Sequence, residues 1–450
     1  MNRHVGQRAV VIGAGVGGLS AAGALSSYFE NVVVLERDSL PSSATSRSGA
    51  PQDRHAHLIL AGGLNALSQL FPGFAKDLAD AGAVPVNAFQ DIQYERPDVG
   101  VLPRRDCGLS MLCCSRPLIE QVLRQRVAAF GNLTLQSQCR VTDIVPGTNP
   151  LSVRFVDSAG HATAIAADLV IDASGRGAPT LALLEALGAE RPPETAVGVD
   201  IGYTTACLPQ PSAAAINAKI LYTLPDPPGL TLGGLLMPIE NGQCLVTLST
   251  RCSSRQPQSW PDFLAALRRL RTPAIYNAVR DLPPPTALKH YLLEESRWRH
   301  FERLPRLPRG LLPVADSLCR FNPVYGQGMT VAALQAKLLH DTLARMAEER
   351  DPIIALQTDF MANVAPLLQA PWILGVNADF AFPGTRGQRP EQYEESRRFE
   401  AALFRAAVAD PVVQRALCEV MQLVKPFELL DSPDIQRRIK AAAEAVTVPG

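Results

Sequence analysis

The sequence has no cysteine pair spaced C-x-x-C, although it contains nine cysteines, and only Cys113 and Cys114 are adjacent. Scattered cysteines argue against a zinc site or a disulfide framework and are typical of reduced, buried thiols. The motifs H-E-x-x-H and G-x-S-x-G and the P-loop are also missing. The common hydrolase and kinase signatures are therefore unsupported, and we expect no metal site.

Charge imbalance and long apolar runs are absent too. The 43 basic and 43 acidic side chains give a formal net charge of zero, with no basic run and no acidic tail. Nothing in this balance favours nucleic acid as a partner. No stretch of 18 apolar residues occurs, so no membrane span is predicted, and the glycine-broken apolar segment from Ala9 does not resemble a signal peptide. We expect a cytoplasmic protein.

What the sequence does contain is a dinucleotide-binding pattern near its start. The apolar run Ala9–Ile12 leads into a G-x-G-x-x-G motif formed by Gly13, Gly15 and Gly18. The first glycine permits a tight turn, the second lets the main chain approach a pyrophosphate, and the third allows close packing of helix against strand. The start of the following helix then offers free N–H groups and a positive dipole end to the phosphates.

The elements after the glycines are in register with this pattern. A helix is expected over Leu19–Phe29 and a second strand over Val32–Leu35, followed by Glu36, which lies 23 residues after Gly13. The Glu36 carboxylate can accept hydrogen bonds from ribose hydroxyls, and we include the adjacent Arg37 in the predicted cofactor site. A glycine motif alone is a weak signal, but strand, turn, helix, strand and acid together are a strong one.

A long polar loop, Arg37–Gln52, follows that acid and precedes Arg54, His55 and His57. Loops of this length beside a nucleotide site are more often functional than linkers. The loop can deliver Arg54 toward phosphates and the histidines toward a ring system, although one histidine can equally satisfy a helix start. Arg116 begins another helix, at the wrong end for the helix dipole, so its charge needs either a phosphate or a carboxylate.

Two later strands each end in an acid that is followed by a glycine-containing loop. Asp172 follows one buried strand and Asp316 follows the other. Such loops lie at the carboxyl edge of a parallel sheet, where ligands bind. The loop after Asp316 contains Pro323, Gly326, Gly328 and Met329. Its N–H groups can point at one spot at the start of a long helix and favour a developing negative charge there.

Together, the three motifs resemble the single-component (group A) flavoprotein monooxygenases over roughly residues 1–340. In that family the first motif binds the ADP part of FAD, the acid–glycine turn serves FAD and NAD(P)H, and a Gly-Asp motif places its acid on the ribityl chain. Asp316 matches that acid, but Ala315 stands where the family has glycine. The resemblance implies FAD as cofactor, with NADPH or NADH as electron donor, directly or through a flavin reductase. It also implies that Arg54 and Arg116 lie near the cofactor.

Within that family, residues 49–57 and 321–329 are most similar to bacterial epoxidases of polyether polyketide pathways and, more distantly, to squalene epoxidases. This implies insertion of one oxygen atom from O2 into a small apolar natural product, by alkene epoxidation through a flavin C4a-hydroperoxide. The cofactor carries that chemistry, so no catalytic residue is assigned. Aromatic or indole hydroxylation is the alternative, with Tyr203, Tyr222 and Tyr291 as loose candidates for a phenol partner. The W-x-W-x-I-P motif of flavin-dependent halogenases is absent.

Two further alternatives fall outside this reaction class. An FAD-dependent isoprenoid reductase shares the fold and would add two hydrogens instead of oxygen. A flavoprotein carrier, or a protein that binds a membrane surface through its C-terminal helices, would have no activity. The charged segment 391–405 is the only feature that could serve such binding, and a run of this kind is more often a solvated face.

The expected fold class is α/β, with a Rossmann-type FAD-binding domain, an inserted and mostly antiparallel substrate sheet, and a helical C-terminal region. We place the first part of the FAD-binding domain at residues 1–190, with inserted strands near 85–115. The substrate domain is expected at 191–305, the second part of the FAD-binding domain at 306–345, and the helical region at 346–450. The whole interpretation requires three distant segments to converge on one flavin nucleotide.

Overall fold

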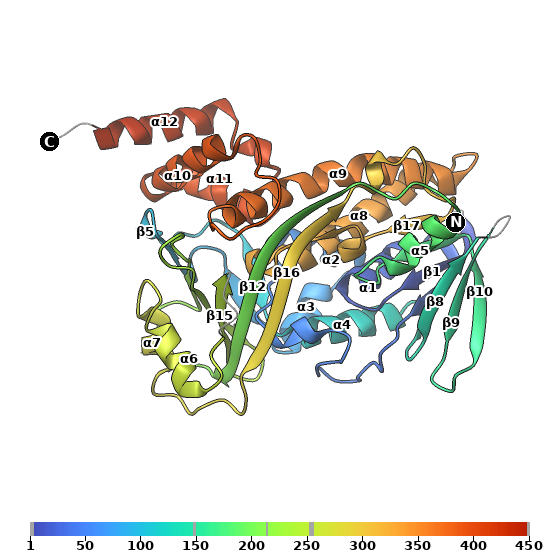
Figure 1. The fold of residues 1–450 in the computed structure, drawn as a ribbon, viewed down its shortest axis with the longest axis horizontal. Helices are drawn as coiled ribbons and strands as arrows, with labels where there is room; N and C mark the ends of the chain where they lie inside the picture. Colours follow the sequence, from blue (N-terminus) through green and yellow to red (C-terminus); the bar gives the residue numbers. More distant parts are fainter. Residues whose placement is uncertain (1–3, 147–149, 213–214, 252–255, 448–450) are drawn as a thin grey trace.

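The computed structural model describes residues 4–146, 150–212, 215–251 and 256–447, and it confirms the predicted α/β fold class (Figure 1). One part of the molecule is built on a parallel sheet, a large and mostly antiparallel sheet lies beside it, and the chain ends in a group of helices. Within these ranges, no helix combines the length and the apolarity needed to cross a lipid bilayer.

Five parallel strands form the first sheet, in the order β17-β11-β1-β2-β7. Their bounds are β1 Gly6–Ile12, β2 Phe29–Leu35, β7 Leu133–Gln136, β11 Leu169–Asp172 and β17 Leu311–Pro313. Ala9 and Val11 belong to one core, whereas Val10 and Ile12 belong to another. The strand is therefore buried on both faces, as parallel strands usually are.

Each face of this sheet has its own cover. The first is packed by α1 Val16–Leu25, α2 Ala61–Leu70, α3 Phe74–Asp80, α4 Arg116–Ala128, α8 Gly328–Met346 and α9 Pro352–Asp379. The second is packed by α5 Ala178–Ala186 and by a small antiparallel sheet of β8 Arg140–Val145, β9 Leu151–Val156 and β10 Ala162–Ala167. The segments that carry the predicted motifs lie at the carboxyl ends of β1, β11 and β17.

The first helix and the second strand begin earlier than expected. The helix α1 covers Val16–Leu25 rather than Leu19–Phe29, and β2 begins at Phe29 rather than at Val32. Phe29 is fully buried and pairs with Gly6 of β1. Packing against the neighbouring strand therefore outweighs the helical preference of this segment.

The large sheet has eight strands in the order β18-β16-β12-β15-β14-β13-β4-β5. Their bounds are β4 Ile92–Arg96, β5 Gly100–Val101, β12 Glu194–Pro209, β13 Ile220–Thr223, β14 Gly233–Ile239, β15 Gln243–Arg251, β16 Lys289–Arg299 and β18 Cys319–Arg320. A tight turn at 240–242 joins β14 to β15, with Asn241 and Gly242 in the left-handed region. On one side the sheet carries α6 Trp260–Leu267 and α7 Ala274–Val279.

The strands expected near residues 85–115 divide between two sheets. β3 Val84–Asn87 pairs with β6 Ser110–Cys113 in a separate ribbon. The strand β4 instead joins the large sheet, parallel to β13, and β5 follows it as the edge strand. Only β4 and β5 of this segment therefore belong to the large sheet.

The C-terminal helices are α9, α10 Tyr393–Ala409, α11 Pro411–Met421 and α12 Pro433–Thr447. Figure 1 shows the last three grouped beyond the end of the large sheet that carries β5. The helix α9 continues through both Pro366 and Pro371. Pro371 is buried within the packed part of α9, so tertiary packing compensates for the lost hydrogen bond. Pro411, in contrast, is the first residue of α11.

Ala315, which stands where the resembling family has glycine, adopts a left-handed conformation with φ +52°. A β-carbon added to Gly17 of α1 would lie 2.6 Å from the Ala315 β-carbon. The two segments therefore touch through a position that only glycine fits. The left-handed conformation is unfavourable for alanine by about 1 kcal/mol.

We expect Gly17→Ala to lower the free energy of unfolding by about 2 kcal/mol, because it overpacks this contact. In an Ala315→Gly background the same change should become neutral or stabilising by up to about 1 kcal/mol, the gain in helix propensity. Urea denaturation of the two single variants and the double variant measures this coupling. Additive effects would contradict the contact.

Candidate functional site

The glycine turn after β1 brings the three predicted segments together. Gly13 has φ +101°, and a β-carbon on it would lie 2.7 Å from the Ala173 carbonyl oxygen at the end of β11. The Ala173 N–H in turn donates to the Ile12 carbonyl at 3.0 Å. Because Gly17 touches Ala315 beyond β17, the turn contacts both later segments. The expected convergence is therefore present.

The Asp172 side chain points into the protein rather than toward the glycine turn that follows β1. Its Oδ1 accepts from the Ser174 N–H at 3.0 Å and from the Ser317 hydroxyl at 3.2 Å. Its Oδ2 accepts from the N–H and the hydroxyl of Thr180, at 3.2 and 2.6 Å. The carboxylate is fully buried, so it holds the turn between β11 and α5 in place. A cofactor would meet this turn through its main chain.

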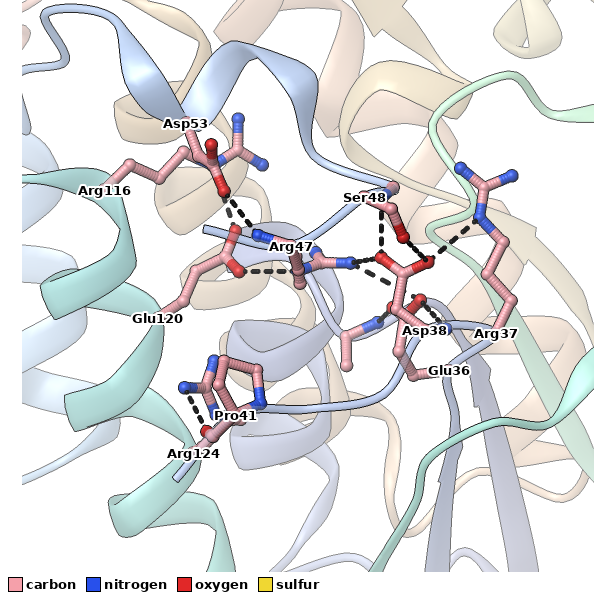
Figure 2. A network of polar contacts seen from close by, with 12 residues as sticks. Glu36, Arg37, Asp38, Pro41, Arg47, Ser48, Asp53, Arg116, Glu120 and Arg124 are labelled. Atoms are coloured by element: carbon pink, nitrogen blue, oxygen red, sulfur yellow. Dashed lines mark hydrogen bonds and ion pairs between the residues drawn. The ribbon is translucent and has the colours of Figure 1, made fainter. Parts of the chain in front are cut away.

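Arg47, in the loop that follows β2, lies at the centre of a buried ionic network that the sequence did not indicate (Figure 2). Its Nη1 lies 2.8 Å from Asp38 and 3.4 Å from Glu36, and its Nε donates to Glu120 at 3.0 Å. Burial disfavours the charged form of Arg47, but Glu120 and Glu36 outweigh it, so the pKa is raised above its ordinary value. The contact with Glu120 therefore holds the loop that follows β2 against α4.

Arg116 belongs to the same network. Its Nε donates to the other oxygen of Glu120 at 2.9 Å, which is the carboxylate alternative that we left open. A β-carbon on Gly15 would lie 3.7 Å from Nη2 of Arg47 and 3.8 Å from Nη2 of Arg116. Two guanidinium groups therefore reach the start of α1, where no side chain caps the helix. Uncapped N–H groups beside two cations fit a diphosphate well.

Glu36 is buried, and each of its oxygens holds one main-chain donor. Oε2 accepts from the Ala14 N–H at 2.7 Å and Oε1 from the Asp38 N–H at 3.0 Å. A carboxylate has about four acceptor positions, so capacity for ribose hydroxyls remains. Arg37 and Arg54, by contrast, are exposed, and the Arg37 side chain lies 3.9 Å from Asp38. Arg37 therefore meets the network only through Asp38 (Figure 2).

Asp316 has a carboxylate without a hydrogen-bond partner among the described residues. Burial raises its pKa, while Arg116 and Arg320 oppose that shift. The side chain is still partly accessible, so it faces space rather than packed protein. An unpaired carboxylate beside the glycine turn fits a polyol such as a ribityl chain. Together, Gly13, Gly15, Glu36, Arg116 and Asp316 fit the parts of an FAD molecule.

The loop after Asp316 opens onto a cavity of 1020 Å³. The predicted residues Pro323 and Gly326 line it, whereas Gly328 and Met329 begin α8, which also lacks a side-chain cap. The other walls come from β12, β15 and β16 of the large sheet and from α9, α10 and α11. The cavity volume is at the upper end of the range typical of small-molecule sites.

Both histidines of the early pair line the same cavity. His57 Nδ1 lies 2.8 Å from the His55 carbonyl oxygen, which can only accept, so Nδ1 carries the proton and Nε2 is left as an acceptor. His55 Nδ1 shares a hydrogen bond with Thr205 at 2.8 Å. Burial lowers the pKa of His55 to about 4 and that of His57 to about 3. Both rings are therefore neutral at physiological pH.

These histidines are expected to make the fold sensitive to acid. Their folded pKa values lie below the ordinary 6.5, so between pH 6.5 and about 4 the unfolded chain binds protons that the folded chain cannot. Stability is then greatest above pH 6.5 and falls with decreasing pH, by up to about 1.4 kcal/mol per unit for each histidine.

Urea denaturation of the wild type and of His55→Gln, measured from pH 7.5 down to about pH 5, tests this expectation. The variant should have the shallower dependence, whereas His4→Gln, at an exposed position, should match the wild type. Equal slopes in all three proteins would contradict the assignment.

Within the described ranges, no group of three or more His, Cys, Asp or Glu side chains could hold a metal ion. The sequence also gave no sign of Arg251 and Asp379, which form a buried ion pair in which Arg251 lines the cavity. Each is a single charged residue in an ordinary strand or helix. Only the tertiary structure brings them together.

Comparison with known proteins defines the class. Residues 7–352 match the family described as FAD binding domain, and the chain belongs to that family. It is 30% identical over 441 residues to Protein Rv3254 of Mycobacterium tuberculosis, covering 94% of this chain and 90% of that protein. FAD is the cofactor that this family implies, in agreement with the geometry around Gly13.

Solved structures show the same fold at low sequence identity. A flavoprotein/dehydrogenase from Cytophaga hutchinsonii has a TM-score of 0.69 at 14% identity, covering 98% of this chain and all of that one (100%). PqsL, a probable FAD-dependent monooxygenase from Pseudomonas aeruginosa, has a TM-score of 0.63 at 14% identity, with coverages of 84% and 96%. p-Nitrophenol 4-monooxygenase PnpA from Pseudomonas putida DLL-E4 has 0.63 at 17% identity, with 94% and 99%. The protein thus has the fold of FAD-dependent monooxygenases.

Proposed function

We propose that this protein is an FAD-dependent monooxygenase that inserts one oxygen atom of O2 into an apolar natural-product substrate, and that the reaction is alkene epoxidation. Family membership and fold support the class, and the large cavity beside the Pro323–Gln327 loop supports a sizeable substrate. NADPH or NADH would supply electrons, directly or through a flavin reductase.

The observation that favours epoxidation is the weak basicity of the two histidines that line the cavity. His55 and His57 are neutral and, with pKa values of about 4 and 3, are weak bases. Burial raises the pKa of Tyr203 and Tyr222, so both remain protonated. An alkene needs no deprotonation before it accepts oxygen, whereas a phenol benefits from it.

Bound FAD would activate O2 once it is reduced, and the chain would provide its setting. The uncapped start of α8, with Gly328 as its first residue, would favour negative charge on the flavin ring end. The Nε2 of His57 would accept a hydrogen bond from a donor in the cavity. The helices α10 and α11 would exclude water from the ring.

Aromatic hydroxylation is the second candidate, and one observation favours it. Tyr203, Tyr222 and Tyr291 all line the cavity, so the polar partners that a phenol substrate requires are present. Their hydroxyls would hold a phenol by hydrogen bonding rather than remove its proton, because burial keeps Tyr203 and Tyr222 uncharged.

One experiment separates these candidates. Purified protein is supplied with FAD, NADPH or NADH, and isotopically labelled O2, and is offered apolar alkenes and phenols in parallel, with and without a flavin reductase. Epoxidation predicts one labelled oxygen in an alkene product. A labelled phenol product would favour hydroxylation, and a product that gains two hydrogens and no label would indicate a reductase. Protein without bound flavin would refute the proposal.

A further inference from the structure

Arg251 lines the cavity and forms a charged pair with Asp379, which is not itself a lining residue. Arg251 ends β15 and Asp379 ends α9, so the pair connects the large sheet with the C-terminal helices. Their side chains are only 4% and 1% exposed. A lone buried charge of either sign would be strongly unfavourable, so each of these groups depends on the other.

One carboxylate oxygen of Asp379 is held by three groups within the protein. Besides Arg251, its Oδ1 accepts from the Asn322 side chain at 2.9 Å and from the Tyr325 hydroxyl at 2.7 Å. The guanidinium of Arg251 also donates to the Tyr325 hydroxyl at 3.0 Å and lies 4.5 Å from the centre of the Phe382 ring. The cation is therefore compensated before any ligand enters.

Neutral polar groups surround this pair on the sheet. Tyr203 pairs with Ser249 on β15 and with Tyr291 on β16, and Ser249 shares its face of the sheet with Arg251, two residues later. The Tyr203 hydroxyl and Nη1 of Arg251 have no hydrogen-bond partner among the described residues. Both residues line the cavity, and these two buried donors are left without an acceptor inside the described protein.

The other two arginines of the wall are also paired with carboxylates. Arg96 pairs with Asp98 at 2.9 Å and with Glu400 at 3.0 Å, and Arg397 pairs with Glu400 at 2.5 Å. The exposed Asp226, Glu395 and Asp431 add further negative charge to the lining. Among the described residues that line the cavity, every arginine therefore has a carboxylate partner.

We propose that the cavity selects an uncharged ligand with a hydrogen-bond-accepting oxygen, such as a carbonyl, and that Asp379 determines this selectivity by neutralising Arg251. An anion near Arg251 would also meet the Asp379 carboxylate in a medium of low dielectric constant. A neutral carbonyl can accept from Arg251 and Tyr203 at a smaller desolvation cost. The inference rests on the proposed function only in calling this ligand the substrate.

Three ligands with one ring system and different charges test the proposal: 2-naphthamide, 2-naphthoate and 2-naphthylmethylammonium. Dissociation constants are measured by equilibrium dialysis with the FAD-loaded protein. The pH is about 7.5, where the carboxylic acid and the amine both carry their full charge. The wild type should bind the amide about tenfold more tightly than either ion, because burial of an uncompensated charge is unfavourable.

The charge-changing variants should shift this preference in opposite directions. Asp379→Asn leaves Arg251 uncompensated and should improve naphthoate binding relative to the amide by about tenfold. Arg251→Gln leaves Asp379 uncompensated and should improve ammonium binding by a similar factor. Asp351→Asn removes a carboxylate from a pair outside the cavity and should leave all three ratios unchanged.

Tighter binding of naphthoate by the wild type would overturn the proposal, as would unchanged ratios in both cavity variants. Should one of these variants fail to fold, as judged by circular dichroism, the other still decides the question. Flavin content and labelled product report on the proposed function separately. A protein that prefers the amide but never oxygenates a substrate would refute that function and leave the charge selectivity intact.

Discussion

Replacing Gly18 with alanine is expected to abolish FAD binding and to lower the free energy of unfolding by about 3 kcal/mol, the upper end of the range for overpacking. The added β-carbon would lie 1.9 Å from the Gly13 carbonyl oxygen. The turn and α1 would have to separate, and the phosphate-binding N–H groups would move with them. Urea denaturation and titration with FAD measure the two effects.

Gly15→Ala is the matched control for this change. Its β-carbon would meet nothing closer than Nη2 of Arg47 at 3.7 Å, which is an ordinary contact. The apoprotein should therefore retain its stability to within about 1 kcal/mol. FAD affinity should still fall about a hundredfold, which corresponds to two lost hydrogen bonds to a charged group. Wild-type affinity in this variant would show that the main chain at Gly15 does not approach the diphosphate.

Glu120→Gln is expected to destabilise the apoprotein by about 3 kcal/mol, the usual effect of breaking a buried ion pair. The carboxylate is 4% exposed and accepts the Nε–H groups of both Arg47 and Arg116. Without it, Arg116 loses its carboxylate partner, and Arg47 keeps only Asp38 and Glu36. Because a bound diphosphate restores negative charge, saturating FAD should recover part of the loss.

The pH dependence of this variant provides a second test. Burial opposes ionisation of Glu120, but Arg116 and Arg47 outweigh it, so its pKa is lowered from the ordinary 4.5. The stabilisation is therefore fully present above pH 4.5 and is lost as the pH falls through the folded pKa. The difference between wild type and variant should shrink in acid. Glu185→Gln, on the exposed side of α5, should have no effect at either pH.

The glycine turn and the acids at Asp172 and Asp316 were predictable because strand, turn and helix follow one another directly in the chain. Arg47 was not, since a single arginine in a polar loop has no periodicity, and its partner Glu120 lies 73 residues away. The same holds for Arg251 and Asp379, which are separated by 128 residues. Local patterns indicate where a main chain turns, whereas ion pairs of this kind depend on tertiary packing.

The strand β4 illustrates the same limit for the fold. Its residues indicate a strand, but its neighbour β13 begins more than a hundred residues later, at Ile220. The sequence therefore identified the strand without the sheet to which it belongs. The convergence of Gly13, Ala173 and Ala315, in contrast, follows from the regular order of a parallel sheet, in which carboxyl ends share one edge.

The packing of α10 and α11 over the cavity limits how far the protein can be shortened. Phe404 and Leu417 from these helices share a core with Leu60, Phe89 and Met111. Gln414 also donates to the Pro103 carbonyl oxygen at 2.6 Å. A truncation after α9 would uncover this apolar surface, and the remaining fragment would tend to aggregate. Crystallisation or engineering efforts should therefore retain the chain at least through α11.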